Sequence, residues 1–202
     1  MERRNFISKV PVMLAAFAAG TSNLRASQLA SSNTTRYINV MDYGAIGDGS
    51  HDDTSAIQGA ITSLSATGGG IYFPPGNYVV SSTITLIPNL TISGFGATSV
   101  KIFPQATGIN VFQYLPSTEQ PANISISGLE IDCTSVSGIT GFYIQLSNNI
   151  YFHGIVFTGC DYSIQLDQCS YAEINSCVSR GSPYNKAGTL KLFSTSATNY
   201  IN

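Results

Sequence analysis

Short segments in which apolar and polar residues alternate recur along the second half of the chain and can be aligned with one another. The segments are NLTISGF, NISISGL, NIYFHGI and YAEINSC, which begin at residues 89, 123, 149 and 171. Their starts are 34, 26 and 22 residues apart. Alternation predicts strands with one buried face. Repeats of this length predict a solenoid, because each rung buries its apolar face only by stacking on the next rung.

The alignment predicts which side chains stack on one another along the solenoid. Two apolar columns are expected to point inward: Ile92, Ile126, Phe152 and Ile174 in one, and Phe95, Leu129, Ile155 and Cys177 in the other. A bend column lies between them: Gly94, Gly128, Gly154 and Ser176. Asn89, Asn123 and Asn149 open three rungs and are expected to form a hydrogen-bonded ladder, since equivalent residues lie about 4.8 Å apart. NYIN at residues 199–202 begins a fifth copy, with Ile201 inward.

A helical pattern follows the acidic stretch DYGAIGDGSHDD at residues 42–53. An apolar stripe predicts a helix over about residues 53–66: Ala56, Ile57, Ala60, Ile61 and Leu64. Asp52 or Asp53 suits the N-cap, and both acids favour the positive end of the helix dipole. The stretch lacks side-chain oxygens at two positions that an EF-hand calcium loop requires. We therefore interpret these acids as scaffold rather than as a catalytic or metal site.

The stretch DYGAIGDGSHDDTSAIQGAI followed by GGGIYFPPGNYVV resembles the N-terminal signature of the pectate-lyase-like superfamily. The resemblance is to the branch shared by rhamnogalacturonases, polygalacturonase-related hydrolases and phage tailspikes, and it covers about residues 38–80. It implies an all-β fold, a right-handed parallel β-helix with an N-terminal capping helix. In that superfamily the segment caps the end of the β-helix, which agrees with a scaffold role for the acids.

The first 26 residues have the layout of an export signal. Arg3 and Arg4 precede an apolar run over residues 10–20, which is too short to span a bilayer. The paired arginines resemble a twin-arginine signal, and an ordinary Sec signal is the alternative. Residues 27–36 would then be a linker, and 37–202 the β-helix domain of an exported protein, periplasmic or secreted.

Removing the signal changes the charge and the redox setting of the chain. It takes away four of nine basic and one of eleven acidic residues, leaving a net charge of −5. No basic patch then remains to hold a nucleic acid, and no second apolar segment to hold a membrane. Export permits disulfides among the cysteines, and a Cys160–Cys169 bridge is one candidate, although most are expected to be small buried fillers.

The resemblance also indicates where chemistry would lie. Hydrolases of the superfamily use paired aspartates, and its lyases use calcium held by acids together with a basic residue. With FYIQL, YSIQL and TLKL taken as equivalent strands, Asp161 alone matches a polygalacturonase catalytic position, and no histidine follows. Asp132 from the preceding rung and Asp167 across the same rung are its candidate partners. Glu130 and Asp132 are expected to be solvated outward groups. No cofactor or metal is predicted; calcium would be needed only in a lyase.

Two classes of function stay open. One is an exported enzyme that degrades an acidic polysaccharide, resembling pectin or rhamnogalacturonan hydrolases or lyases. The other is a non-catalytic β-helix that binds carbohydrate or is structural, or an inactive fragment of a longer enzyme. The chain stops inside a rung, which predicts either truncation at the C-terminal end or a homo-oligomer that covers the open end.

Overall fold

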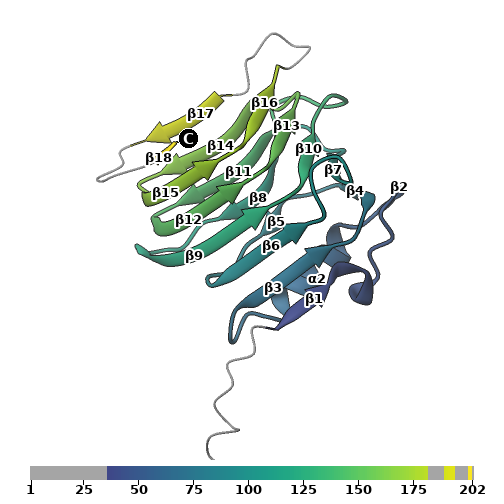
Figure 1. The fold of residues 1–202 in the computed structure, drawn as a ribbon, viewed down its shortest axis with the longest axis horizontal. Helices are drawn as coiled ribbons and strands as arrows, with labels where there is room; N and C mark the ends of the chain where they lie inside the picture. The colour runs from purple at the N-terminus through teal and green to yellow at the C-terminus, as the bar shows by residue number, and fades with distance from the viewer. Residues whose placement is uncertain (1–35, 182–188, 194–199, 202) are drawn as a thin grey trace, which may run out of the picture. The chain divides into compact units, whose positions relative to one another are not determined.

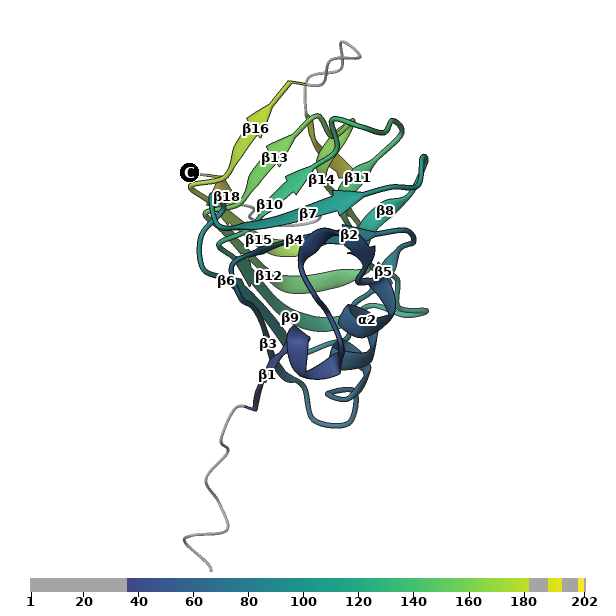
Figure 2. The ribbon, with the colours of Figure 1, turned by 90° about the vertical axis from the view of Figure 1, so that its right-hand side faces the viewer.

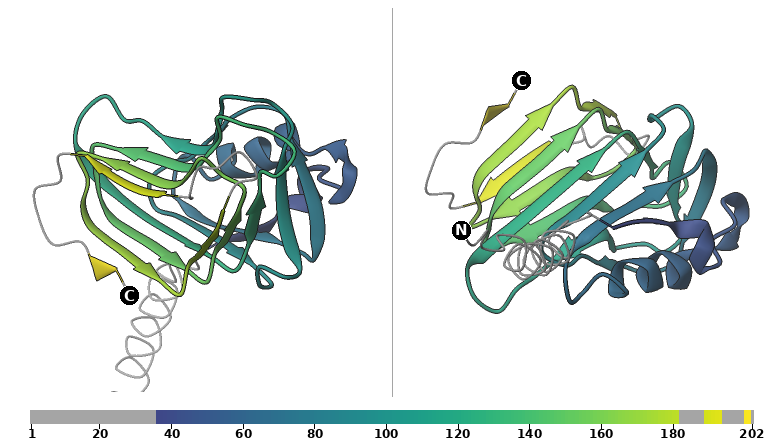
Figure 3. Two further views of the ribbon diagram at one scale, coloured as in Figure 1. Left: turned by 90° about the horizontal axis from the view of Figure 1, so that it is seen from above. Right: turned by 60° about the horizontal axis from the view of Figure 1, so that its bottom comes forward.

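The computed structural model describes residues 36–181, 189–193 and 200–201, with side chains over residues 36–181. These residues wind into a right-handed parallel β-helix whose successive turns add strands to three parallel sheets (Figure 1). The strands of neighbouring turns run side by side along the stack (Figure 3). The all-β solenoid predicted from the repeats is confirmed. The export-signal interpretation concerns residues 1–26, which lie outside the described residues.

The three sheets are named A, B and C. Sheet A contains β1 (Tyr37–Asn39), β3 (Gly69–Phe73), β6 (Leu90–Gly94), β9 (Gln120–Ser127), β12 (Ser147–His153), β15 (Ser170–Asn175) and β18 (Tyr200–Ile201). Sheet B contains β2 (Asp48–Asp52), β4 (Gly76–Val80), β7 (Val100–Pro104), β10 (Glu130–Asp132), β13 (Val156–Thr158) and β16 (Val178–Arg180). Sheet C contains β5 (Ile84–Thr85), β8 (Asn110–Tyr114), β11 (Thr140–Gln145), β14 (Tyr162–Asp167) and β17 (Thr189–Phe193).

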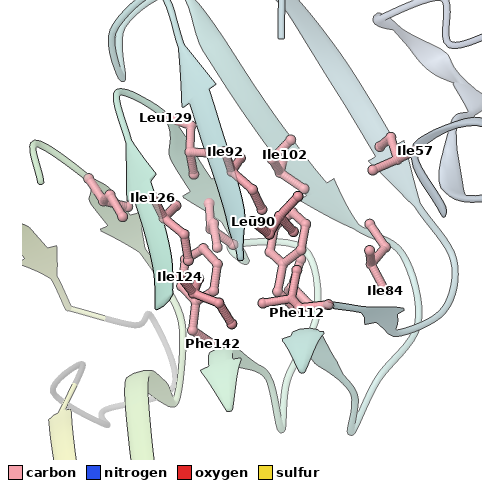
Figure 4. Close-up of a cluster of buried hydrophobic side chains, with 14 of the residues drawn as sticks. Ile57, Ile84, Leu90, Ile92, Ile102, Phe112, Ile124, Ile126, Leu129 and Phe142 are labelled. Atoms are coloured by element: carbon pink, nitrogen blue, oxygen red, sulfur yellow. The ribbon is translucent and has the colours of Figure 1, made fainter. Parts of the chain in front are cut away.

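The core is made of inward columns from the three sheets (Figure 4). Ile92, Ile126, Phe152 and Ile174 stack in the predicted register, and the backbone of Ile201 continues it. From sheet C, the ring of Phe112 stacks on that of Phe142, with centroids 5.0 Å apart. Since each buried aliphatic or aromatic side chain contributes about 1.5–3 kcal/mol, these columns supply most of the driving force for folding.

The second predicted column needs one correction. Leu129 and Ile155 are fully buried and Cys177 is half-buried, as expected for an inward column. Phe95, however, is 67% exposed, and its ring contacts that of Tyr72 edge-on. The turn after β6 is longer than the turns after β9 and β12, so buried Val100 lies level with Leu129 instead.

The N-terminal end of the stack is covered by η1 (Val40–Tyr43) and α2 (Thr54–Thr62), which lies beside β5 (Figure 2). The predicted helix is therefore confirmed, although it ends in turns four residues earlier than expected. Its buried face carries the predicted stripe, Ala56, Ile57, Ala60 and Ile61. Within the described residues, no helix has both the length and the apolar character needed to cross a membrane.

The two acids before α2 have different structural roles. Asp53 holds the N-cap position, but its carboxylate does not cap the helix; it is fully buried and accepts hydrogen bonds from the amides of Ile46 at 2.7 Å and Gly47 at 3.3 Å. Exposed Asp52 accepts from the Thr54 amide and from the Ser81 hydroxyl at 2.6 Å. Bonds from the Ser81 and Thr54 hydroxyls lower the pKa of Asp52. Both acids therefore organise the scaffold, as the sequence predicted.

The predicted asparagine ladder is present, with Asn89 just before β6, Asn123 inside β9 and Asn149 inside β12. Asn123 donates to the side-chain oxygen of Asn89 at 2.8 Å, and Asn149 donates to that of Asn123 at 2.9 Å. All three residues have left-handed backbones, with φ between 47° and 59°. Among non-glycine residues, asparagine is one of the few that readily adopt the left-handed conformation.

Asn123→Ala is expected to lower the free energy of unfolding by about 2 kcal/mol, because it removes two hydrogen bonds and places alanine at positive φ. Asn123→Gly is the matched control, since it loses the same bonds but accepts the backbone, and should cost about half as much. Urea unfolding followed by circular dichroism measures both. Equal stability of wild type and Asn123→Ala would contradict the ladder.

The predicted Cys160–Cys169 bridge is wrong. Cys133 and Cys160, at equivalent places in neighbouring turns, form a disulfide with Cα atoms 5.1 Å apart. Cys160 and Cys169 stand at opposite ends of β14, a strand of six residues that spans about 20 Å. A disulfide requires Cα atoms within about 7 Å of each other. Cys169 is a buried free thiol, which agrees with the expectation of small buried fillers.

Native Cys169 is expected to resist alkylation at pH 8. Burial raises the pKa of its thiol to about 11, so only about one molecule in a thousand carries the reactive thiolate. Half-buried Cys177, whose pKa burial also raises, should react faster because reagent reaches it more easily. Iodoacetamide labelling read by mass spectrometry, with and without denaturant, tests this. Native Cys169 that reacts as fast as the denatured thiol would contradict its placement.

Candidate functional site

The outer face of sheet B carries two columns of side chains that continue through neighbouring turns. One column contains Asn77, Lys101, Glu130, Val156 and Val178. The other runs beside it and contains Val79, Phe103, Asp132, Thr158 and Arg180. In the second column Arg180 lies two turns from Asp132. Ionisable, aromatic and hydroxyl side chains therefore lie together on one face.

A pocket of about 400 Å³ opens on this face beside the first turns of the stack. The strands of sheet B and the segment after β10 supply its walls: Gly49, Val79, Phe103, Pro104, Gln105, Asp132, Ser135 and Val136. The lining combines an aromatic ring and aliphatic surface with an amide, a hydroxyl and a carboxylate. Such a mixture is typical of sites that bind a ligand carrying both apolar and hydroxyl groups.

Beside the pocket, Glu130 takes part in a network that spans three turns. Its carboxylate lies 3.1 Å from the Lys101 amine and accepts a hydrogen bond from the Thr158 hydroxyl at 2.7 Å. The sequence predicted a solvated surface group, but Glu130 is only 5% exposed. The correction has a simple cause: its side chain does point outward, and its neighbours in the stack cover it. The network fixes Lys101 in place while leaving its side chain one-third exposed.

Asp132, the last residue of β10, is the predicted site residue that lies in the pocket. It is half-buried, and one carboxylate oxygen accepts hydrogen bonds from the amide and, at 2.7 Å, the hydroxyl of Thr134. These two bonds orient the carboxylate from the following turn. Asp132 can therefore present a fixed negative charge or a hydrogen-bond acceptor to a ligand in the pocket.

Asp161 lies elsewhere, in the turn between Cys160 and β14. It is 6% exposed, and its carboxylate accepts hydrogen bonds from the amides of Gly138 and, at 3.0 Å, Ile139. These bonds tie two neighbouring turns together at the entrance to sheet C. Like the carboxylate of Asp53, that of Asp161 accepts hydrogen bonds from backbone amides and so stabilises the local fold.

Asp167 ends β14 and is half-buried beside Tyr143. Burial, followed by the charge of Asp167 and a hydrogen bond to it, raises the pKa of the Tyr143 hydroxyl. Asp167 stands six positions after Asp161 along the extended chain, a distance of about 20 Å. Paired carboxylates of glycosidases lie about 5–9.5 Å apart. The structure thus does not bring Asp161 and Asp167 together, and a catalytic role for any of the three aspartates stays a prediction.

The register of sheet C differs from the strand alignment that pointed to Asp161 and Asp167. Phe142 pairs with Ile164 and Ile144 with Leu166, so FYIQL and YSIQL are offset by two residues from the alignment used for prediction. The pocket instead lies over sheet B, whose strands after β7 are only three residues long. The sequence did contain a sign of this face, because Glu130 and Asp132 alternate with inward Ile131. Three residues are too few, however, to establish the two-residue periodicity of a strand.

Over the described residues, no group of three or more His, Cys, Asp or Glu side chains is placed to hold a metal ion. Whether calcium enters, as it would in a lyase, stays a prediction. His153 is exposed on sheet A, between Ser127 and Asn175, and lies on a different sheet from the pocket.

Comparisons with known proteins agree with this architecture. Residues 37–136 match the family model for rhamnogalacturonase A/epimerase, pectate lyase-like. Mannuronan C5-epimerase AlgE3 of Azotobacter vinelandii is 40% identical over 106 residues, covering 46% of this chain and 6% of the relative. Alginate lyase 7 of the same organism is 32% identical over 154 residues, covering 68% of this chain and 17% of the relative. The chain thus spans less than a fifth of these relatives.

Among solved structures, the A-module of A. vinelandii mannuronan C-5 epimerase AlgE4 superimposes with a TM-score of 0.67 at 22% identity. The match covers 82% of this chain and 50% of the A-module, and at this identity it establishes the fold alone. The family match, the parallel β-helix and this structural similarity agree with one another. The chain is a member of the pectate-lyase-like superfamily of right-handed parallel β-helix proteins.

Proposed function

We propose that the protein is an exported, polysaccharide-acting β-helix protein that binds an acidic polysaccharide on the outer face of sheet B. One observation carries the proposal. Residues 36–181 contain three Lys or Arg residues, and two of them lie on this face: Lys101 next to Glu130, and Arg180 two turns beyond Asp132. In a chain with a net negative charge, such placement favours an anionic ligand at this face.

The pocket supplies the remaining contacts that a sugar polymer needs. Phe103 offers an aromatic surface, while Gln105 and Ser135 offer hydrogen-bonding groups to sugar hydroxyls. The columns of sheet B run along the stack, so a polymer lying in that direction would meet Phe103, Asp132, Thr158 and Arg180 in turn. The names of the mannuronan epimerases and of the alginate lyase among the relatives support a uronate polymer as the ligand.

Turnover is the second part of the proposal. The enzymes among the relatives favour it, and Asp132 is the acid that we propose to contact the substrate, because it alone of the three predicted aspartates lines the pocket. The described residues that line the pocket contain one carboxylate, whereas hydrolysis requires two. Epimerisation or elimination at a uronate therefore fits the pocket better than hydrolysis does.

Affinity electrophoresis in gels containing polymannuronate tests the binding. We expect the purified protein to be retarded, and Arg180→Ala to weaken binding about fivefold, by loss of one charge-assisted contact of about 1 kcal/mol. Arg36→Ala is the matched control, because it removes a cation at the start of sheet A. Equal losses in the two variants, or no retardation of wild type, would refute the proposed face.

A parallel assay separates binding from turnover. Unsaturated-product absorbance reports elimination, and exchange of the sugar C5 proton with deuterium reports epimerisation. Asp132→Asn is expected to abolish either signal while the protein stays folded. Turnover unchanged in this variant would remove Asp132 from the chemistry and leave the binding proposal standing.

A further inference from the structure

The outer face of sheet A carries a set of aromatic and hydroxyl side chains, away from the pocket. Along β6 and β9 the outward residues are small hydroxyl residues: Thr91, Ser93, Ser125 and Ser127. Aromatic residues flank these four hydroxyl residues along the stack, on β3 on one side and on β12 and β15 on the other. Tyr72 on β3 contacts highly exposed Phe95 on one side, and exposed Tyr151 and Tyr171 belong to β12 and β15 on the other.

Tyr171 stands at a position where asparagine would stabilise the fold better. It follows Asn89, Asn123 and Asn149 in the left-handed ladder position, at φ 54°, yet it cannot continue the side-chain hydrogen bonds. A bulky residue at positive φ is strained, and asparagine would suit this place both in conformation and in bonding. Its ring is instead 56% exposed, and Tyr151, itself 45% exposed, belongs to the strand one turn before, two residues further along. A residue that breaks a local rule in this way indicates selection for something other than folding.

The few charged side chains on the outer face of sheet A favour an uncharged ligand over an anionic one. The outward residues of β3, β6, β9, β12 and β15 include one carboxylate, Glu173, and no Lys or Arg. Glu173 accepts a hydrogen bond from the neighbouring amide of Asn175. On these five strands an anionic polymer would meet one carboxylate and no Lys or Arg, with the imidazole of His153 beside them. A ligand with apolar ring faces and uncharged hydroxyl groups would meet tyrosines, hydroxyls and an amide.

From these observations we propose that the outer face of sheet A is a second carbohydrate-binding site, specific for a neutral polysaccharide. Three strand spacings separate β3 from β12, so the aromatic flanks are about 14 Å apart along the stack. A polysaccharide segment lying along the stack rests its ring faces on Tyr151 and Tyr171 at one end and on Tyr72 and Phe95 at the other. Tyrosine is suited to such contacts, because it supplies a rigid amphipathic surface at low entropic cost.

Affinity electrophoresis with three neutral probes, a soluble β-1,3-glucan, a galactomannan and a xylan, tests the proposal. We expect at least one probe to retard the wild-type protein, and Tyr151→Ser with Tyr171→Asn to weaken that binding at least tenfold. Tyr43→Ser, which removes an exposed tyrosine from η1, is the matched control and should bind as wild type does. Arg180→Ala should also keep this binding, so the sheet A and sheet B sites can fail independently.

The melting temperature distinguishes a binding role of Tyr171 from a structural one. If Tyr171 stabilised the fold, its replacement would lower the melting temperature. Tyr171→Asn alone should melt at the same temperature as wild type or higher, because it extends the asparagine ladder, while its neutral-glycan binding falls. Absence of retardation by all three probes, or unchanged binding in the double variant, would overturn the proposal. So would a concentration-dependent dimer that the double variant abolishes, since a second copy of the chain would then be the occupant of this face.

Discussion

Phe152→Asp is expected to abolish folding of the β-helix. The Phe152 ring is almost completely buried, stacks between Ile126 and Ile174 in the inward column of sheet A, and lies 5.2 Å from the ring of Phe142. Losing the ring alone costs about 3–5 kcal/mol, and burying an unpaired carboxylate adds to that cost. The sum approaches the whole stability of a typical domain. We expect insoluble or proteolysed protein on expression.

The neighbouring substitution Tyr151→Asp is the control for this result. Tyr151 precedes Phe152 in the same strand but points outward and is 45% exposed. A charge there stays solvated, so the protein should remain soluble and lose less than about 1 kcal/mol of stability. Circular dichroism and limited proteolysis of the two proteins make the comparison. Similar behaviour of the pair would mean that the inward and outward positions of β12 are wrongly assigned.

Asp53→Ala is expected to cost about 3 kcal/mol, the second-largest effect. The buried carboxylate serves the amides of Ile46 and Gly47, and charge-assisted hydrogen bonds contribute about 1.5–3 kcal/mol each. The loop it holds has little freedom to adjust, because Gly47 has φ 68° and lies against the ring of Tyr78. Asp53→Asn should be intermediate, since its amide can accept only one of the two bonds.

Asp52→Ala is the matched control for Asp53. Asp52 is exposed, so its loss should cost about 1 kcal/mol, typical of a cap at the start of a helix. Urea unfolding of the three variants gives the comparison, and polysaccharide binding per folded molecule should be unchanged in all of them. A melting temperature for Asp53→Ala equal to that of wild type would show that these bonds do not hold the N-terminal loop.

The sequence predicted the fold well wherever equivalent residues repeat with their neighbours. Ile126 and Phe152 could be aligned because the strands of sheet A are long and alternate clearly, and an asparagine stands at the same register position in or beside three of them. Phe95 was misplaced because the length of a turn is not encoded in strand periodicity. The disulfide partner of Cys160 was missed for a related reason, since pairing across turns depends on the register at the ends of β10 and β13.

The site was less predictable than the fold. In the sequence, Asp161 matches the position of a catalytic acid. In the structure, its carboxylate accepts hydrogen bonds from the backbone amides of Gly138 and Ile139. The sequence predicted that Glu130 is solvated. In the structure, Lys101 and Thr158 from the neighbouring turns contact its carboxylate and cover it. Contacts of this kind join residues of different turns, so they follow from three-dimensional register rather than from local pattern. Asp132 was predicted, but the pocket around it was not.

Hydrogen exchange with bound oligomannuronate tests most directly whether the functional face is that of sheet B. Peptides covering β7, β10 and the segment after β10 should become protected from deuteration when the oligosaccharide is added, because these segments line the pocket. Peptides from β9 and β12, whose outward residues lie on sheet A, should exchange as they do in the free protein. Protection confined to sheet A, or absent from both faces, would contradict the account.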